Sequence, residues 1–428
     1  GISLQKGFLP PPGEAKHDWE IMCLFAQKMG FSEGFNYPHQ VDIFREHAEL
    51  SALDNERVRA FDISAMSNIT LEEYENLQPI QWPVTRDKPE GAKRLFDDGY
   101  FYTPSHKAKF IPITARLPKQ PPVAGEVIMN TGRIRDQWHT MSRTGTAPHL
   151  LSHTQEPYID IHPADASALQ VNEGELVTLS NRGATYIGRA KLSKAQRLGE
   201  VFVPMHWNAK YASSARADAL VNPFTDPICG QPEFKHSPVK INKHATKWSG
   251  WLLAENDLQP QCDYWAKITS EAGFRYRLAS SVVDDLSAWL ARQFPSVTDW
   301  QTLNDSEAKC YRAAGYENGR LVVVFNAEQG HALPAESRWA ESLLGLELDD
   351  SQRYAILAGN EGSGAMDEGA IICSCFQIGE NTIKQAIAGG CVSAEALGKQ
   401  LKCGTNCGSC IPELNALVQS VDIAEVSE

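Results

Sequence analysis

The sequence predicts a multidomain α+β protein, and three observations support this fold class. A chain of 428 residues is long enough for two to four domains. Its first part shows helical periodicity, and its middle part shows short apolar strands separated by turn residues. Its end is a short helical segment with two closely spaced pairs of cysteines. We therefore expect several domains with different architectures.

Composition limits the possible partners and compartments. The formal net charge of -13 argues against a nucleic-acid-binding protein. No apolar run is long enough for a membrane span, and no secretory signal pattern opens the chain. The ten cysteines then indicate ligands and buried thiols in a reducing, cytoplasmic setting. The start at Gly1, without methionine, predicts that the chain is the carboxy-terminal portion of a longer protein.

The first region predicts helices and then strands. Asp18 to Met29 has the pattern of a helix whose buried face includes Met22 and Phe25, capped by Asp18 and ended by Gly30. Further helical pieces are expected from Phe35 to Pro83, and aromatic strands around a turn from Asp98 to Pro112. The proline-rich run Pro118 to Pro122 indicates a domain boundary.

Beyond this boundary the pattern predicts a β-barrel. Short strands recur at close spacing, and Leu176 to Leu192 is typical of a hairpin that turns at Asn181 to Gly183. Near the first strand, Thr131-Gly132-Arg133, His139-Thr140 and Arg143-Thr144-Gly145 gather hydroxyl, imidazole and guanidinium groups. Such a cluster can bind phosphate and a polar heterocycle. Solvated arginines and a hydrogen-bonded structural histidine explain the same residues equally well.

The region from Trp248 to Met366 predicts an α+β domain without a chemical motif. Lys267 to Leu278 and Gly319 to Asn326 are expected as strands, and Val282 to Phe294 and Pro334 to Leu344 as helices. Cys262 and Cys310 have no partner pattern and are expected to be structural. Residues Asn360 to Glu368 are rich in glycine and acids and predict a flexible joint.

The strongest chemical signal is the pair Cys373-Ser-Cys375 followed, after thirty-one residues, by Cys407-Gly-Ser-Cys410. Four soft ligands on a small helical segment can bind an iron-sulfur cluster or zinc. Helices are expected at Glu380 to Ala388, from Ser393 to about Leu401, and from Cys410 to about Val421. The C-x-C spacing favours iron-sulfur over zinc, and free buried thiols are the remaining alternative.

This segment resembles the bacterioferritin-associated-ferredoxin family from Gly369 to Val418, because Gly404, Gly408 and the Cys-Ile-Pro helix start match along with the cysteines. The resemblance implies a [2Fe-2S] cluster held by Cys373, Cys375, Cys407 and Cys410. Cys391 and Cys403 are extra thiols outside that set.

The run Thr131-Gly-Arg-Ile-Arg-Asp-Gln-Trp-His-Thr140 is similar to a run in molybdopterin oxidoreductases of the nitrate reductase and formate dehydrogenase type. That resemblance implies a double-psi barrel that binds molybdopterin guanine dinucleotide. It also places His206 and Trp207 near a substrate funnel. The residues implied as dinucleotide contacts are Thr131, Gly132, Arg133, His139, Thr140, Asn222 and Lys235.

The early segment around Phe44 to Ser51 resembles the assimilatory nitrate reductase large subunit. The resemblances together imply a molybdenum enzyme that reduces nitrate to nitrite, fed by a ferredoxin, a flavodoxin or an NADH-dependent reductase subunit. The molybdenum ligand and a [4Fe-4S] cluster are expected upstream of Gly1, so no catalytic residue is expected in this chain. Formate dehydrogenase and a non-catalytic electron-transfer module are the alternatives. The expected domains are 1–117 (end of the catalytic domains), 123–245 (dinucleotide-binding barrel), 248–366 (α+β spacer) and 369–421 ([2Fe-2S] domain).

Overall fold

A computed structural model describes residues 1–331, 333–334, 338–359 and 368–425. The chain forms two compact units, Gly1–Arg116 and Leu117–Glu428, and each is described by itself. No helix within the described residues is long and apolar enough to cross a membrane.

The first unit contains the expected helices but not the expected strands. Its helices are α1 (Asp18–Lys28), α2 (Gln40–Ala52) and α3 (Leu71–Glu75), and its small core includes Ile63 and Val84. The predicted cap at Asp18 is wrong, because α1 begins after His17, whose N–H donates to the Glu20 carboxylate at 2.9 Å.

Two further predictions for this unit are wrong. Met22 and Phe25, expected on a buried face of α1, are 61% and 63% exposed within the described unit. Residues 98–112 contain no strand, and Phe110 is 95% exposed. Aromatic residues favour strands where a partner strand is available to pack against, but here Phe101 stacks on Phe96 and Tyr100 on His106 within the same stretch of chain.

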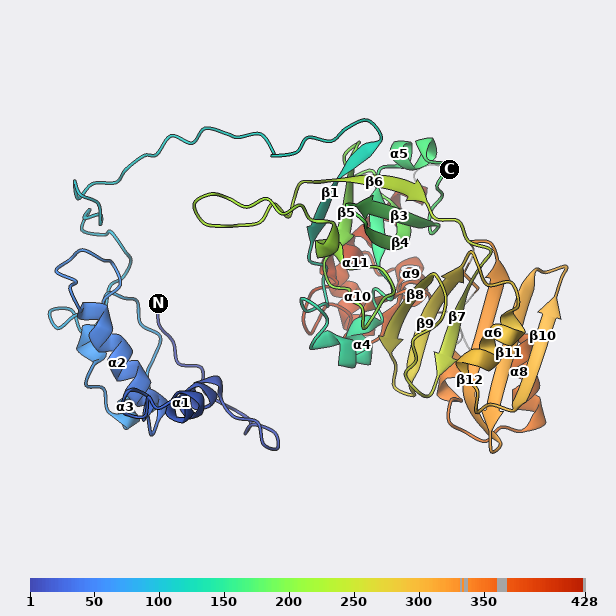
Figure 1. Ribbon diagram of the computed structural model, residues 1–428, viewed down its shortest axis with the longest axis horizontal. Helices are drawn as coiled ribbons and strands as arrows, with labels where there is room; N and C mark the ends of the chain where they lie inside the picture. The colour runs from blue at the N-terminus through green and yellow to red at the C-terminus, as the bar shows by residue number, and fades with distance from the viewer. Residues whose placement is uncertain (332, 335–337, 360–367, 426–428) are drawn as a thin grey trace. The chain divides into compact units, whose positions relative to one another are not determined.

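The second unit begins with a closed barrel (Figure 1). Its strands follow the spatial order β1-β5-β2-β4-β3-β6, with β1/β5 and β2/β4 parallel and the other pairs antiparallel. The predicted barrel is therefore confirmed. The strands are β1 (Glu126–Gly132), β2 (Tyr158–Ile161), β3 (Leu176–Asn181), β4 (Ala184–Leu192), β5 (Glu200–Pro204) and β6 (Ser237–Lys243), and the short helices are α4 (Pro148–Leu151) and α5 (Pro163–Ala168).

The barrel interior and its hairpin follow directly from the sequence pattern. Met129, Ile159 and Val203 are fully buried inside it. The β3–β4 turn falls at Arg182 and Gly183, whose φ angles of 47° and 83° suit a two-residue hairpin turn.

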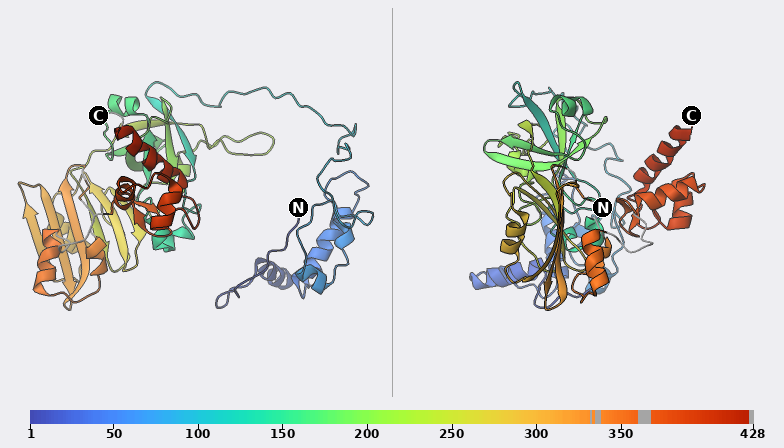
Figure 2. Two further views of the ribbon diagram at one scale, coloured as in Figure 1. Left: turned by 180° about the vertical axis from the view of Figure 1, so that it is seen from behind. Right: turned by 90° about the vertical axis from the view of Figure 1, so that its right-hand side faces the viewer.

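The next domain is a six-stranded antiparallel sheet ordered β10-β11-β12-β7-β9-β8. Helix α6 (Leu286–Gln293) covers one face, where Trp289 packs on Trp248 and Phe325 at ring-centroid distances of 5.8 Å and 5.7 Å. Helices α7 (Arg338–Ser342) and α8 (Asp350–Ala358) cover the other face (Figure 2). The strands are β7 (Trp248–Ala254), β8 (Tyr264–Thr269), β9 (Phe274–Ser280), β10 (Asp299–Asp305), β11 (Cys310–Glu317) and β12 (Arg320–Gln329).

The prediction of one strand over Lys267 to Leu278 is wrong, because the chain turns between β8 and β9. Ser270 N–H donates to the Gly273 carbonyl at 2.9 Å, and the two strands pair with each other. Apolar residues lie on both sides of this turn, and the signal that marks it is the short polar segment Ser270 to Gly273.

The last domain is the small helical domain expected from the sequence. It comprises β13 (Ile371–Cys373), β14 (Ile378–Gly379), α9 (Glu380–Ala388), α10 (Ala394–Leu401) and α11 (Ile411–Glu425). The bounds predicted for α9 are confirmed, and Ser393 caps α10 by accepting from Ala396 N–H at 3.2 Å. The predicted joint Asn360 to Glu368 lies, apart from Glu368, outside the described residues.

Candidate cofactor sites

The loop that follows β1 is held by His206, which is fully buried. His206 Nε2 accepts from Ile134 N–H at 3.0 Å, and Nδ1 lies 2.9 Å and 2.8 Å from the Trp138 and His139 carbonyl oxygens. These contacts require the proton on Nδ1. Burial lowers the pKa of His206 despite the two carbonyl contacts, which favours the neutral ring.

His206 is thus a support for this loop, and Trp207 lies in the barrel core at 1% exposure. Both residues were expected near a substrate funnel, but their burial indicates structural roles inside the protein. The sequence signal for His206 was its position at the end of the strand that pairs with β1.

Three of the expected dinucleotide contacts lie together at the end of β1. The Lys235 ammonium donates to the Thr131 carbonyl, and Lys235 Nζ would lie 3.7 Å from a Cβ placed on Gly132. The same Cβ would lie 3.0 Å from the Phe202 ring. Glycine at position 132 therefore lets the Phe202 ring and the Lys235 ammonium lie close to the backbone.

The next residues extend this site along the loop. Arg133 is exposed, and its Nη2 lies 3.4 Å from His139 Nε2. Thr140 is exposed, and its carbonyl accepts from Asn208 Nδ2 at 2.6 Å. The guanidinium, imidazole and Lys235 ammonium make this end of the barrel suited to an anionic ligand.

Arg143 to Gly145 shape the loop from within. The Arg143 guanidinium stacks over the Trp138 ring at 4.6 Å. Thr144 Oγ1 accepts from Trp138 N–H at 3.3 Å, and Gly145 is packed against Tyr211. These residues fit structural roles better than direct ligand contacts.

Asn222 precedes a long loop that projects from the barrel (Figure 1). Its Oδ1 accepts from Asn181 Nδ2 at 3.1 Å, and the residue is 2% exposed. In the described part of the chain, several buried polar atoms of this region have no hydrogen-bond partner in the protein. They include Asn130 Oδ1, Thr131 Oγ1, Asn222 Nδ2, His236 Nε2 and Ser237 Oγ.

Buried polar atoms without partners are costly and indicate a missing ligand or water. The unpaired atoms are both donors and acceptors, and they accompany exposed cations at the same barrel. A dinucleotide, with its phosphates and its polar heterocycles, matches this combination. The residues present therefore fit the predicted cofactor.

The four cysteines of the last domain form two pairs, each with one member from each motif. Cys375 Sγ lies 3.3 Å from Cys407 Sγ, and the Cys373 and Cys410 thiols are hydrogen-bonded to each other. The first pair is partly exposed, whereas Cys373 and Cys410 are 2% and 1% exposed. Within the described residues, no three His, Cys, Asp or Glu side chains are grouped to hold one metal ion.

Two pairs of thiols suit a cluster in which each of two irons takes two cysteines better than one tetrahedral zinc. Burial raises the pKa of Cys410 to about 12, whereas hydrogen bonds with Ser409 lower the pKa of Cys407. A thiolate at Cys410 therefore requires a neighbouring cation, as metal ligation provides.

The surrounding residues support this arrangement. Gly404 and Gly408 have φ angles of 77° and 73°, as expected for the close turns of the second cysteine loop. Cys391 donates to Gln400 Oε1 at 2.9 Å. Cys403 is fully buried, and burial raises its pKa.

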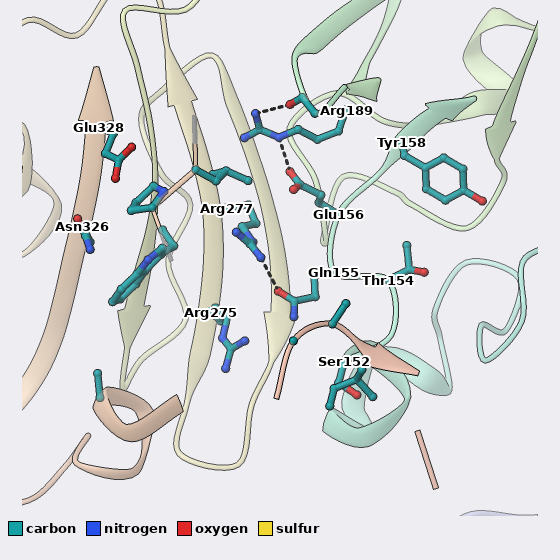
Figure 3. Close-up of a pocket in the computed structure, with 18 of the residues that line it drawn as sticks. Ser152, Thr154, Gln155, Glu156, Tyr158, Arg189, Arg275, Arg277, Asn326 and Glu328 are labelled. Carbon is teal, nitrogen blue, oxygen red and sulfur yellow. Dashed lines mark hydrogen bonds and ion pairs between the residues drawn. The ribbon is translucent and has the colours of Figure 1, made fainter. Parts of the chain in front are cut away.

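A cavity of about 1770 Å³ lies between the barrel, the six-stranded sheet and the last domain, and Ile134, Arg135 and Glu413 are among the residues that line it. Glu156 and Arg189 from the barrel side and Arg277 and Asn326 from the sheet line it (Figure 3). Glu156 Oε2 accepts from Arg189 Nε at 3.1 Å and from Tyr264 OH at 2.6 Å. This buried network joins the two domains.

The fold and its sites define a redox protein with a nucleotide-binding barrel and an iron-sulfur domain. Residues 127–238 match the family described as "Molydopterin dinucleotide binding domain", and residues 371–420 match the "BFD-like [2Fe-2S] binding domain". The barrel is thus a molybdopterin dinucleotide-binding domain, and the last domain is a BFD-like domain. Their cofactors are molybdenum-molybdopterin guanine dinucleotide and [2Fe-2S].

Similar proteins are nitrate reductases and formate dehydrogenases by name. A nitrate reductase of Klebsiella oxytoca is 36% identical over 97% of this chain and 48% of its own length. The assimilatory nitrate reductase catalytic subunit of Bacillus subtilis is 31% identical over 56% of this chain and 32% of its own. An F420-dependent formate dehydrogenase subunit alpha of Methanocaldococcus jannaschii is 30% identical over 56% and 33%.

The chain spans about half the length of the Klebsiella relative. Among solved structures, acetylene hydratase from Pelobacter acetylenicus aligns with 55% of this chain and 34% of its own, at 18% identity and a TM-score of 0.38.

Proposed function

We propose that this chain supplies the dinucleotide-binding and [2Fe-2S] domains of a molybdenum-dependent nitrate reductase. The reaction is nitrate plus two protons and two electrons to nitrite and water. Molybdenum, bound through the pterin, supplies the oxygen-transfer chemistry. In this proposal the molybdenum ligand and a [4Fe-4S] cluster belong to the half of the enzyme that this chain does not include.

The observation that carries the proposal is the extent of the similarity. The Klebsiella nitrate reductase matches nearly the whole chain, including the last domain, whereas the Methanocaldococcus formate dehydrogenase matches about half of it. A nitrate reductase and a formate dehydrogenase are both consistent with the barrel, so the barrel alone does not identify nitrate or formate as the substrate.

In this proposal, seven barrel residues hold the dinucleotide. Arg133 and Lys235 pair with its phosphates, Gly132 allows close backbone approach, and Thr131 and Asn222 bind polar groups through their unpaired buried atoms. His139 and Thr140 complete the contacts on the same loop.

Cys373, Cys375, Cys407 and Cys410 hold the [2Fe-2S] cluster, through which electrons reach the enzyme. We assign the donor to a cytoplasmic ferredoxin, flavodoxin or NADH-dependent reductase subunit, because a [2Fe-2S] domain carries one electron at a time.

A paired assay tests the proposal. The purified enzyme that contains this chain is given reduced viologen with nitrate, and oxidised viologen with formate. We expect nitrite from nitrate and no formate oxidation. Formate oxidation without nitrite would establish the formate dehydrogenase alternative, and neither activity in a molybdenum-loaded enzyme would favour a non-catalytic module.

A further inference from the structure

The BFD-like domain contacts the barrel through one arginine next to the dinucleotide loop. The Arg135 guanidinium donates to both carboxylate oxygens of Glu413, at 3.2 Å and 2.6 Å, and to the Ile372 carbonyl at 2.6 Å. Arg135 Nη1 lies 3.4 Å from Ser409 Oγ. The arginine side chain is 18% exposed. One barrel residue therefore contacts both cysteine segments of the other domain.

The next residue, Asp136, joins the same two segments through its carboxylate. Asp136 Oδ2 accepts from Ser374 Oγ at 2.8 Å, and Oδ1 accepts from Ser409 Oγ at 3.3 Å. Ser374 stands between Cys373 and Cys375, and Ser409 directly precedes Cys410. Asp136 is 8% exposed and is also paired with Arg135 at 2.8 Å.

A second set of contacts surrounds this pair. His153 Nε2 lies 3.3 Å from Glu413 Oε1. Gln377 Nε2 donates to Ser152 Oγ at 3.1 Å and to the His149 carbonyl at 3.2 Å. The interface is therefore built from matched donors and acceptors, which fixes one orientation of the domain.

Arg135 and Asp136 are also close in sequence to the expected dinucleotide contacts. Arg135 and Asp136 lie on the loop that His206 supports, which begins at Arg133 directly after Thr131 and Gly132 at the end of β1. The same short loop thus carries expected dinucleotide contacts at its start and contacts to the cysteine segments two residues later.

We propose that Arg135 and Asp136 are positioning residues that dock the BFD-like domain on the dinucleotide loop and lower the reduction potential of its cluster. The part about potential rests on the proposed cysteine ligands. A negative charge that is hydrogen-bonded to both cysteine segments disfavours the additional electron of the reduced cluster.

The alternative is a domain that is tethered by the chain and docks only transiently. Release would break the charge-assisted contact of Arg135 with Glu413. It would break the contacts of Asp136 with Ser374 and Ser409 at the same time, so the observed contacts oppose frequent release of the domain. The two arrangements predict different exchange behaviour at the interface and different effects of Asp136 on the cluster.

The test compares variants of the complete chain carrying its cluster. Asp136→Asn and Arg135→Ala are matched with Asp284→Asn and Arg197→Ala, which change exposed charges elsewhere on the same unit. Arg135→Lys keeps the charge but loses the bidentate contact with Glu413. This variant replaces Arg135→Ala in the comparison if the alanine variant folds poorly.

Potentiometric titration of the cluster provides the first readout. We expect Asp136→Asn to raise the midpoint potential of the cluster by up to about 59 mV. For a one-electron couple this shift corresponds to a tenfold higher affinity for the electron. Asp284→Asn should leave it unchanged. A potential unaffected by Asp136→Asn would overturn the electrostatic part of the proposal.

Hydrogen exchange provides the second readout and does not depend on the cluster. Arg135→Ala should speed exchange of the amides of residues 372–377 about tenfold or more, while the interior of α9 stays protected. Arg135→Lys should have a smaller effect. Unchanged exchange would overturn docking by this pair. A wild-type chain without iron would instead contradict the cluster assignment and leave the exchange result valid.

Discussion

Replacing Glu156 by alanine should destabilise the contact between the barrel and the six-stranded sheet. Glu156 accepts from Arg189 at 3.1 Å and from Tyr264 at 2.6 Å. The side chains of Arg189 and Glu156 are only 7% and 15% exposed. The variant therefore leaves a buried guanidinium without its carboxylate.

The size of the effect follows from this geometry. Coulomb's law at an effective dielectric constant of about 20 gives about 5 kcal/mol for unit charges at the 3.1 Å separation. Breaking a buried pair from one side costs about 3 to 5 kcal/mol in comparable cases. Glu156→Gln keeps the volume and one acceptor, so its cost should be smaller, about 1 to 3 kcal/mol.

Native-state hydrogen exchange measures this loss locally, without assuming that the whole chain unfolds as one unit. A loss of about 3 kcal/mol corresponds to exchange more than a hundredfold faster for amides of β2, β4 and β8. Amides of β10 and β11 serve as the internal control. An increase below tenfold in Glu156→Ala would refute the buried-pair reasoning.

The same carboxylate predicts a pH dependence. Burial raises the pKa of Glu156, but Arg189, Arg277 and Tyr264 outweigh it and leave the pKa below its ordinary value. Its stabilising contribution is therefore complete above the ordinary pKa of about 4.3 and is lost as pH falls through the lower folded value. The difference between wild type and Glu156→Ala should shrink over that acidic range.

Three further predictions concern the sites. In the enzyme that contains this chain, Cys407→Ser should abolish nitrate reduction with a protein donor but keep it with reduced viologen. The control variant Cys391→Ser should affect neither activity. Equal loss with both donors would mean that the cluster is structural. Arg133→Ala should lose about 1.5 to 3 kcal/mol of dinucleotide binding, seen as lower bound guanine and molybdenum, and unchanged content would make it a surface charge. Gly145→Ala should destabilise the barrel by about 1 to 3 kcal/mol in chemical denaturation, because its Cβ would overlap Tyr211; a stability equal to wild type would mean that the ring moves aside at little cost.

Local sequence signals predicted the elements that depend on local chemistry. The helix from Glu380 to Ala388 and the turn at Arg182–Gly183 lie where capping, glycine and apolar spacing placed them. The strands expected from 98 to 112 failed because strand formation needs a partner that the sequence pattern does not reveal. The turn between β8 and β9 was missed although Ser270 to Gly273 is a polar segment that ends in glycine, because the apolar strands on its two sides were joined into one expected strand.

The interface between the barrel and the last domain could not be predicted from sequence. Arg135 and Glu413 are 278 positions apart, and each looks like an ordinary surface charge in its own segment. The motif around Arg133 indicated phosphate binding but gave no reason to assign its neighbours to another domain. Only the fold brings these side chains together.

The central claim is that the last domain carries a [2Fe-2S] cluster on four named cysteines beside the dinucleotide loop. The most direct measurement is the content of iron, acid-labile sulfide and zinc in the purified 428-residue chain. The proposed cluster predicts about two irons and two sulfides per chain, all lost in Cys373→Ser. One zinc without iron, or iron that persists in Cys373→Ser, would contradict it.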